Sequence, residues 1–215
     1  MYILCIMSTN NLILRLLQSR KNILNILEKH QNYNIDDYKD FDMSEVDVMY
    51  KNEQLDMLLE NKENTNKTYI KYLLSTKAVR TTQIDQIIED LYQLENVLEK
   101  KDTLIIILFE DPNENLVNHF KHIYNSTGVF VVIHTIRRLQ FNILEHDLVP
   151  EMIILDDEKI EVLKDKYFLN SLKELPDISR FDPQALAMSM RPGEVGQFTR
   201  KSPTSLTTYY YRICV

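Results

Sequence analysis

Glycine is scarce in this chain, with three residues among 215, at positions 128, 193 and 196. Phosphate loops and dinucleotide-binding folds depend on grouped glycines, because their backbone N–H groups must come close to phosphate. Gly128 stands alone, and the other two flank an expected turn and strand. The sequence therefore predicts no nucleotide site of either kind and no bound cofactor.

Cysteine is equally rare, and Cys5 and Cys214 lie at opposite ends of the chain. Two cysteines do not form a disulfide framework, and the local sequence around each shows no catalytic constellation. The N-terminal segment lacks the positively charged start of a secretory signal, and no apolar run reaches the ~20 residues of a membrane span. These absences predict an intracellular protein without a membrane segment.

An excess of basic charge is also missing, since 32 acidic residues outnumber 25 basic ones and the net charge is −7. Wrapping DNA or RNA over a large surface requires a basic field, so general nucleic-acid binding is not expected. Residues 191–215 differ from the rest, because they carry four basic residues and one acid: Arg191, Arg200, Lys201, Arg212 and Glu194. With the three tyrosines that follow, they predict either a docking surface for an acidic partner or a solvated hairpin face.

Apolar periodicity in the first two thirds of the chain predicts an α/β domain, which we place at residues 1–140. Two continuous β-branched runs, at 102–109 and 128–136, are typical of parallel strands buried on both faces. Between them, Asp111 and Pro112 are a suitable helix start, which completes a βαβ unit. The other expected elements are a helix over 11–30, a helix capped by Thr82, and a hairpin formed by 54–59 and 67–74.

Residues 141–215 have a different pattern and predict a separate, small α+β domain. A short strand at 151–155 precedes a helix with acids in its first turn and lysines toward its end, as the helix dipole favours. Asp182 and Pro183 predict the cap and first residue of another helix. Two strands flank the segment "KSPTSL" and predict a terminal antiparallel hairpin.

The last strand, "TTYYYRICV", has mixed character on both faces. Alternation divides its side chains into two sets, Tyr209, Tyr211, Ile213 and Val215 on one face and Thr208, Tyr210, Arg212 and Cys214 on the other. Neither set is purely polar, which predicts a strand that is covered on both sides. Cys214 is accordingly expected as a small buried hydrophobic residue.

Two pairs of residues suggest metal chemistry. Glu110 and Asp111 follow the strand at 102–109, at the sheet edge where open α/β folds bind ligands, and an acidic pair there suits a Mg²⁺-dependent nuclease. The simpler interpretation is that Asp111 caps the next helix. His119 and His122 share one helix face, but two imidazoles without further ligands favour surface histidines. The sequence thus predicts no catalytic residue and no metal site, and the nuclease stays the alternative.

The C-terminal third resembles a known family through a series of short motifs in register over about 70 residues. The motifs are His146–Leu148–Val149–Pro150, Leu175–Pro176, Asp182–Pro183, Gly193–Glu194–Val195, Arg200–Lys201–Ser202 and Tyr211–Arg212. Their order and the terminal strand resemble the C-terminal assembly domain of the fifth subunit shared by the eukaryotic nuclear RNA polymerases, whose archaeal counterpart is the H subunit. The first domain is similar to that family's N-terminal jaw domain in element order alone.

The resemblance implies a non-catalytic core subunit of a DNA-directed RNA polymerase, which acts in transcription within a multisubunit complex and is not a homo-oligomer. The assembly domain would dock on the largest subunit and other core subunits, and the jaw would lie beside downstream DNA. The expected partner-binding residues are Arg191, Arg200, Lys201, Tyr211 and Arg212. The expected structural residues of the motifs are His146, Pro150, Pro176, Asp182, Pro183 and Gly193. The terminal strand would then face its own domain on one side and neighbouring subunits on the other.

The sequence departs from the family pattern at several places. The loop after the strand at 102–109 reads "EDPNEN", which is acidic, where the family often has a Thr-Pro-Ser-Ala-like loop that approaches DNA. Leu206 stands where the last hairpin usually has glycine, and Pro192 replaces a basic residue. The abundance of Ile and Asn indicates an A/T-rich genome and favours a large DNA virus as the source. The expected location is the virion and host cytoplasm if viral, and the nucleus if cellular.

Overall fold

The computed structural model describes residues 2–74 and 79–215, with the backbone alone described for residues 2–10. Two compact units divide the chain, the first ending at Asn142 and the second beginning at Ile143. Among the described residues, no helix combines the length and the apolar character needed to cross a bilayer.

The first unit begins with a helical layer. Helix α1 (Tyr2–Gln31) contains the helix expected over 11–30 and also includes the apolar segment before residue 11. The 3-10 turn η1 (Asp36–Tyr38) and helix α2 (Met43–Lys51) follow. Helix α2 starts with a capping box, because the carboxylate of Asp42 accepts the Glu45 N–H and the carboxylate of Glu45 accepts the Asp42 N–H, each at 2.8 Å.

A four-stranded sheet in the order β1-β2-β3-β4 forms the centre of the first unit. Its strands are β1 (Met57–Glu60), β2 (Lys67–Leu73), β3 (Thr103–Leu108) and β4 (Phe130–Thr135). The β1–β2 pair is an antiparallel hairpin, and β2–β3 and β3–β4 are parallel, as the sequence predicts. Every residue of β3 and β4 is buried, which explains why these two strands are mostly apolar, with Thr103, His134 and Thr135 as buried polar residues at their ends.

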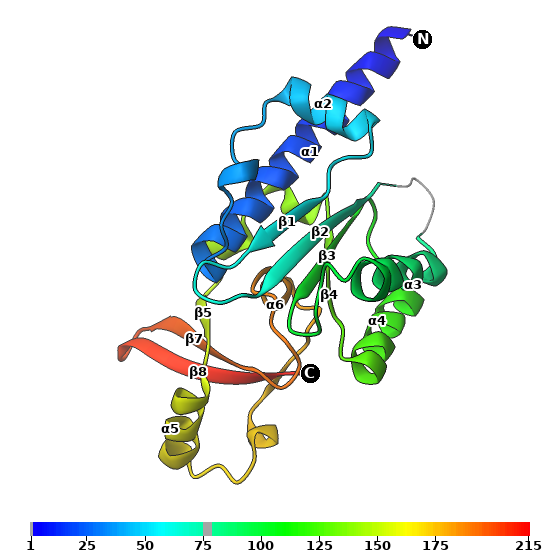
Figure 1. The fold of residues 1–215 in the computed structure, drawn as a ribbon. Helices are drawn as coiled ribbons and strands as arrows, with labels where there is room; N and C mark the ends of the chain where they lie inside the picture. The colour runs from blue at the N-terminus through cyan, green and yellow to red at the C-terminus, as the bar shows by residue number, and fades with distance from the viewer. Residues whose placement is uncertain (1, 75–78) are drawn as a thin grey trace. The chain divides into compact units, whose positions relative to one another are not determined.

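The parallel strands are joined through helices. Helix α3 (Thr81–Glu89), the π-helical turn η2 (Asp90–Leu94) and helix α4 (Glu114–Thr127) make the crossovers, and the 3-10 turn η3 (Arg138–Gln140) ends the unit. Right-handed crossovers place α3 and α4 on the same face of the sheet, and α1 lies on the opposite face (Figure 1). The helices therefore cover both faces of the central strands.

Both predicted helix starts in this unit are wrong. Helix α3 begins two residues earlier than expected, and the Gln83 side chain accepts the N–H of Arg80 at 3.1 Å, so Thr82 lies inside the first turn. Helix α4 is capped by Asn113, whose side chain accepts the Leu116 N–H at 2.8 Å. The carboxylate of Asp111 lies 3.6 Å from Nε of Arg138 instead. The cap therefore lies two residues later than expected, because Asn113 provides the acceptor for the first turn.

The second unit is a small α+β fold. Its elements are η4 (Ile143–Glu145), β5 (Glu151–Ile154), α5 (Asp157–Tyr167), η5 (Leu172–Glu174), β6 (Asp177–Ile178), α6 (Pro183–Ala187), β7 (Val195–Ser202) and β8 (Leu206–Cys214). The strands form one sheet in the order β5-β7-β8-β6, in which β7 and β8 are the predicted antiparallel hairpin. The short strand β6 pairs in parallel with the end of β8 and was not expected from the sequence.

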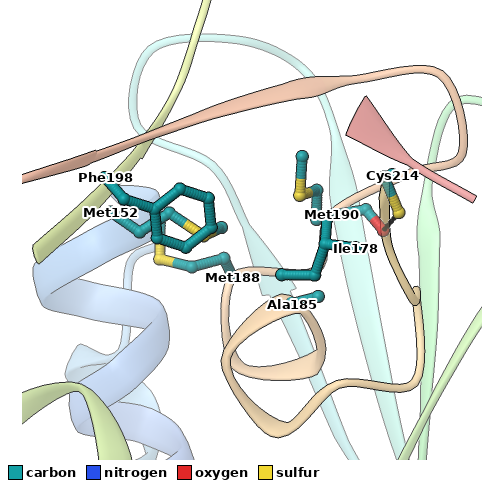
Figure 2. Packing of buried hydrophobic residues seen from close by; sticks show 7 residues of the cluster. All are labelled: Met152, Ile178, Ala185, Met188, Met190, Phe198 and Cys214. Atoms are coloured by element: carbon teal, nitrogen blue, oxygen red, sulfur yellow. Dashed lines mark hydrogen bonds between the residues drawn. The ribbon is translucent and has the colours of Figure 1, made fainter. Parts of the chain in front are cut away.

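Each face of this second sheet has its own apolar cluster. Figure 2 shows the first cluster, which consists of Met152, Ile178, Ala185, Met188, Met190, Phe198 and Cys214 and includes residues of α6. The second cluster, Leu155, Leu163 and Val195, includes a residue of α5 and packs against Ile160 and Tyr211. The sheet is therefore enclosed between α6 and α5. The buried Cys214 confirms its expected role as a small hydrophobic residue, and the side chain of Cys5 lies outside the described part.

Candidate partner interface

The tip of the β7–β8 hairpin is the part of the second unit that its own core leaves uncovered. In the register of the pair, Ser202 lies opposite Leu206 and Arg200 lies opposite Thr208. The side chains of residues 206–209 are exposed, whereas Ile213 and Cys214 at the other end of β8 are buried. Figure 1 shows the turn between the orange β7 and the red β8 at the end of the hairpin that lies far from the C-terminus.

Basic side chains gather around Tyr210 on the face of the hairpin that carries Phe198. The ring of Tyr210 stacks on Phe198 with centroids 4.9 Å apart and an interplanar angle of 15°. The guanidinium of Arg200 lies 4.3 Å from the centroid of Tyr210, and that of Arg212 lies 6.0 Å away. The stacked ring therefore holds two guanidinium groups in place on an exposed surface.

The part of the chain that the structure describes provides no ion pair for the cations of this hairpin. Nη1 of Arg212 donates to the backbone oxygen of Asp177 at 2.8 Å, and Arg200 and Lys201 are exposed. Among the residues that the structure describes, no carboxylate forms an ion pair with Arg200, Lys201 or Arg212. The hairpin tip consequently presents uncompensated positive charge.

The opposite face of the hairpin packs against α5. Tyr211 contacts the ring of Tyr167 edge-on, with centroids 5.8 Å apart, and burial, followed by the nearby Tyr167 and Tyr209, raises the pKa of Tyr211. A shallow groove of about 330 Å³ lies beside this contact, lined on its sheet side by Gln197 and Tyr211 and on its helix side by α5. Both faces of β8 near its end are thus covered by the same unit. Helix α5 therefore covers part of the face that was expected to meet neighbouring subunits, while Tyr209 and Val215 on that face remain more than half exposed.

The motif residues lie together around the sheet as backbone anchors. The carbonyl oxygen of Pro150 accepts Nε2 of Gln184 at 2.6 Å, and that of Pro176 accepts the N–H of Ile213 at 3.0 Å. Gly193 adopts φ +94°, a conformation that favours glycine, and its N–H donates to the oxygen of Cys214 at 2.9 Å. These contacts tie the loops to the end of β8.

The remaining motif residues close turns. Asp182 caps α6 by accepting the Gln184 N–H at 2.9 Å, with Pro183 at the first helical position as predicted. His146 is exposed, and its Nδ1 accepts the Leu148 N–H at 3.2 Å. Arg191 lies before β7, where its N–H donates to the carboxylate of Glu194 at 2.7 Å.

Phe198 is the residue of the candidate interface that the sequence did not single out, and Tyr210 was expected there only as one of three tyrosines. A usable signal existed, because pairing the two strands around "KSPTSL" sets Phe198 opposite Tyr210 and Arg200 opposite Thr208. Residues directly opposite in an antiparallel pair share a face, so the stacked cluster follows from the register.

The two possible metal sites of the first unit are not assembled. Glu110 is exposed, and its neighbour Asp111 is turned toward Arg138. Nε2 of His119 lies 2.7 Å from the carboxylate of Asp85, and His122 is exposed. In the described part of the chain, no three histidine, cysteine or acidic side chains are grouped to hold a metal ion.

Leu206 occupies a strained turn position at the hairpin tip. Its φ is +60° and its side chain is 86% exposed. The left-handed backbone conformation therefore destabilises the turn, and the side chain gains no burial that would offset this. We expect Leu206→Gly to raise the free energy of unfolding of the second unit by about 0.5–1 kcal/mol, because glycine adopts this conformation freely. Urea denaturation of the two chains measures the difference, and Leu206→Ala, which keeps the strain, is the control. Equal stability of the glycine and alanine variants would contradict this account.

Known proteins match the part of the chain that carries this hairpin. The family described as RNA polymerase Rpb5, C-terminal domain, matches residues 141–214. The DNA-directed RNA polymerase subunit Rpo5 of Thermococcus kodakarensis is 45% identical over 76 residues, which cover 35% of this chain and 92% of that protein. The Rpo5 subunit of Pyrococcus abyssi is 42% identical over a stretch with the same coverage.

The matched region coincides with the second unit to within two residues at its start and includes every motif described above. Because nearly the whole length of these relatives is aligned, the similarity extends over their complete fold and not over a fragment of it. Through its C-terminal unit, the chain belongs to the Rpb5/Rpo5 family of DNA-directed RNA polymerase subunits.

Proposed function

We propose that the protein is a non-catalytic core subunit of a multisubunit DNA-directed RNA polymerase, which docks on the largest subunit through its C-terminal unit. The observation that carries the proposal is the basic surface of the hairpin, where Arg200 and Lys201 near the tip and Arg212 near the base have no carboxylate partner within the described residues. An exposed basic surface rigidified by a stacked tyrosine suits an acidic protein surface, since Tyr and Arg are enriched where partners bind. The relatives, named as polymerase subunits, supply the class of partner.

The first unit is proposed as a jaw beside downstream DNA, and residues 1–140 and 141–215 as the functional domains. The support for a jaw is the order of elements in this unit together with its attachment to an Rpb5-type C-terminal unit. Glu110 and Asp111 make the loop after β3 acidic, so we do not expect this loop to contact phosphate. The nuclease alternative has no support, because Asp111 is turned toward Arg138 and not toward a shared metal position.

The location follows from the function. A polymerase subunit acts where its template is transcribed, which is the nucleus for a cellular source and the virion and host cytoplasm for a viral one. Isoleucine and asparagine content favours the viral source, and this stays a prediction from composition.

Charge reversal at the hairpin tip tests the docking proposal. We expect the double variant Arg200→Glu, Lys201→Glu to lower incorporation into the polymerase about 10- to 100-fold, because like charges facing an acidic surface cost several kcal/mol. Co-purification of the tagged chain with co-expressed core subunits, quantified by mass spectrometry, measures the loss. The loss should diminish at high salt, since exposed charges are screened.

The matched control is Lys21→Glu, Lys62→Glu, which makes the same charge change at two exposed lysines of the first unit. Its incorporation should equal that of the unmodified chain. Equal incorporation of both double variants would refute docking through the hairpin tip, and failure of the unmodified chain to co-purify would refute the polymerase assignment.

A further inference from the structure

The outer edge of β8 is open along most of its length. Within the sheet order β5-β7-β8-β6, strand β6 pairs with β8 only at Ile213 and Cys214. From Leu206 to Arg212, the described residues provide β8 with a strand neighbour on one side alone, which is β7. An open edge of this length is a template for another strand.

The hydrogen bonds at Ile213 and Cys214, where β6 pairs with β8, show which backbone groups of β8 face away from β7. Cys214 bonds inward, because its N–H donates to Glu194 and its oxygen accepts from Gly193, both at 2.9 Å. Ile213 bonds outward, because its N–H donates to the oxygen of Pro176 at 3.0 Å. Successive residues of an antiparallel pair alternate between these two directions. The N–H and C=O groups of Tyr209 and Tyr211 therefore point outward, while those of Tyr210 bond to β7.

Thr207, the next outward-facing residue of β8 toward the hairpin tip, already has partners for its backbone groups. The N–H of Thr207 donates to the oxygen of Ser205 at 2.6 Å, and its own oxygen accepts the Ser205 hydroxyl at 3.1 Å. At the opposite end, the chain before β6 occupies the position beside Ile213. The free stretch between them is centred on Tyr209 and Tyr211 and accommodates a short extended segment.

The charges beside this edge indicate the character of the segment. Arg212 lies next to the free stretch, and Arg200 is held over Tyr210, whose position is between the two outward tyrosines. Lys201 is exposed on the other face of the hairpin, opposite Thr207. An added strand whose side chains meet Arg200 and Arg212 gains most if it carries carboxylates.

We infer that an extended, carboxylate-bearing segment of a polymerase core subunit joins the second sheet as a fifth strand along Tyr209–Tyr211. This inference rests on the proposed docking function and specifies its geometry. Main-chain hydrogen bonds from Tyr209 and Tyr211 supply the pairing, and the basic side chains select the acidic segment.

Residue-resolved hydrogen exchange tests the pairing directly. In the isolated chain, the outward amides of Tyr209 and Tyr211 should exchange fast, and the inward amide of Tyr210 should exchange slowly. In the assembled polymerase, Tyr209 and Tyr211 should slow about 10-fold or more, because a paired amide exchanges only on opening. Incorporation of the chain with no slowing at these two amides would overturn strand addition while leaving docking intact.

A proline substitution at Tyr209 is a second test of the proposed main-chain hydrogen bond. Tyr209→Pro removes an outward N–H that the fold does not use, and edge strands tolerate proline, so incorporation should fall about 10-fold while the unit stays folded. Tyr209→Thr is the matched control, since it removes the same ring and keeps the N–H. An equal fall in both variants, or no fall in either, would overturn the inference. Failure of the unmodified chain to assemble would instead refute the proposed function. If the proline variant does not fold, the hydrogen exchange of the Tyr209 and Tyr211 amides decides the question.

Discussion

Replacing Phe198 by alanine is expected to unfold the second unit while the first unit stays folded. Phe198 is 2% exposed and lies in the cluster of the α6 face, beside Met152 and Met188 (Figure 2). Its ring also supports Tyr210 at 4.9 Å. A buried Phe→Ala change costs about 3–5 kcal/mol, which equals the whole stability that a single core supplies in a domain this small.

Hydrogen exchange monitored by mass spectrometry distinguishes the two units in one experiment. Peptides from residues 143–215 should lose protection in the alanine variant, whereas those from β3 and β4 should keep it. Phe198→Leu, which retains most of the volume, should cost about 1 kcal/mol and leave the unit folded. Loss of protection in both units would show that they unfold together and would contradict a boundary near Asn142.

The central strands were predictable because a strand that is buried on both faces consists of consecutive apolar residues. Each of β3 and β4 contains a run of at least four consecutive apolar residues, and the helix between them needs one apolar stripe, so strand, helix and strand follow from local pattern alone. The terminal hairpin was predictable for a similar reason, since "KSPTSL" separates two alternating segments. Strand β6 was not, because two residues carry no periodicity.

Helix starts were less predictable, because several polar residues compete for one position. Asp111, Asn113 and Thr82 are all acceptable caps by residue type. Asp111 lies toward Arg138, a residue distant in sequence, and Asn113 then caps α4. Local sequence contains no information about such a distant partner.

The candidate interface was partly predictable. The charge count identified Arg200, Lys201 and Arg212, and the alternation of β8 assigned the faces correctly. It did not show that α5 returns to cover the Tyr211 face, because that contact joins segments about 45 residues apart whose packing no local rule determines. The consequence is that the exposed tip and edge, and not the end of the strand, are left for a partner.

Arg20 is the second residue whose loss should have a large effect. It lies on the same face of α1 as Leu16, Ile23 and Leu27 and is 2% exposed. Its Nη1 donates to the oxygen of Leu55 at 2.9 Å, and its guanidinium lies 5.0 Å from the ring of Phe41. Burial lowers the pKa of Arg20, yet an arginine stays charged at neutral pH, so the contacts hold a cation inside the unit.

We expect Arg20→Ala to lower the free energy of unfolding of the first unit by about 3–5 kcal/mol. The change leaves the Leu55 carbonyl without its donor, removes the cation from the aromatic rings and opens a cavity, and each effect contributes about 1–2 kcal/mol. Urea denaturation followed by the exchange of β1 and β2 amides measures the loss.

Two further variants separate the causes. Lys21→Ala, at the exposed neighbour of Arg20, should change stability by less than about 0.5 kcal/mol, since it removes a solvated charge. Arg20→Lys keeps the charge but not the planar fork, so it should fall between the alanine variant and the unmodified chain. If Arg20→Ala were as stable as Lys21→Ala, the guanidinium would not link α1 to the segment before β1. The loop that carries Phe41 would then be held by other contacts. Arg20 would be a charge that the apolar face of α1 accommodates without gaining stability from it. A large loss would instead show that one buried cation fixes both the helix and the loop.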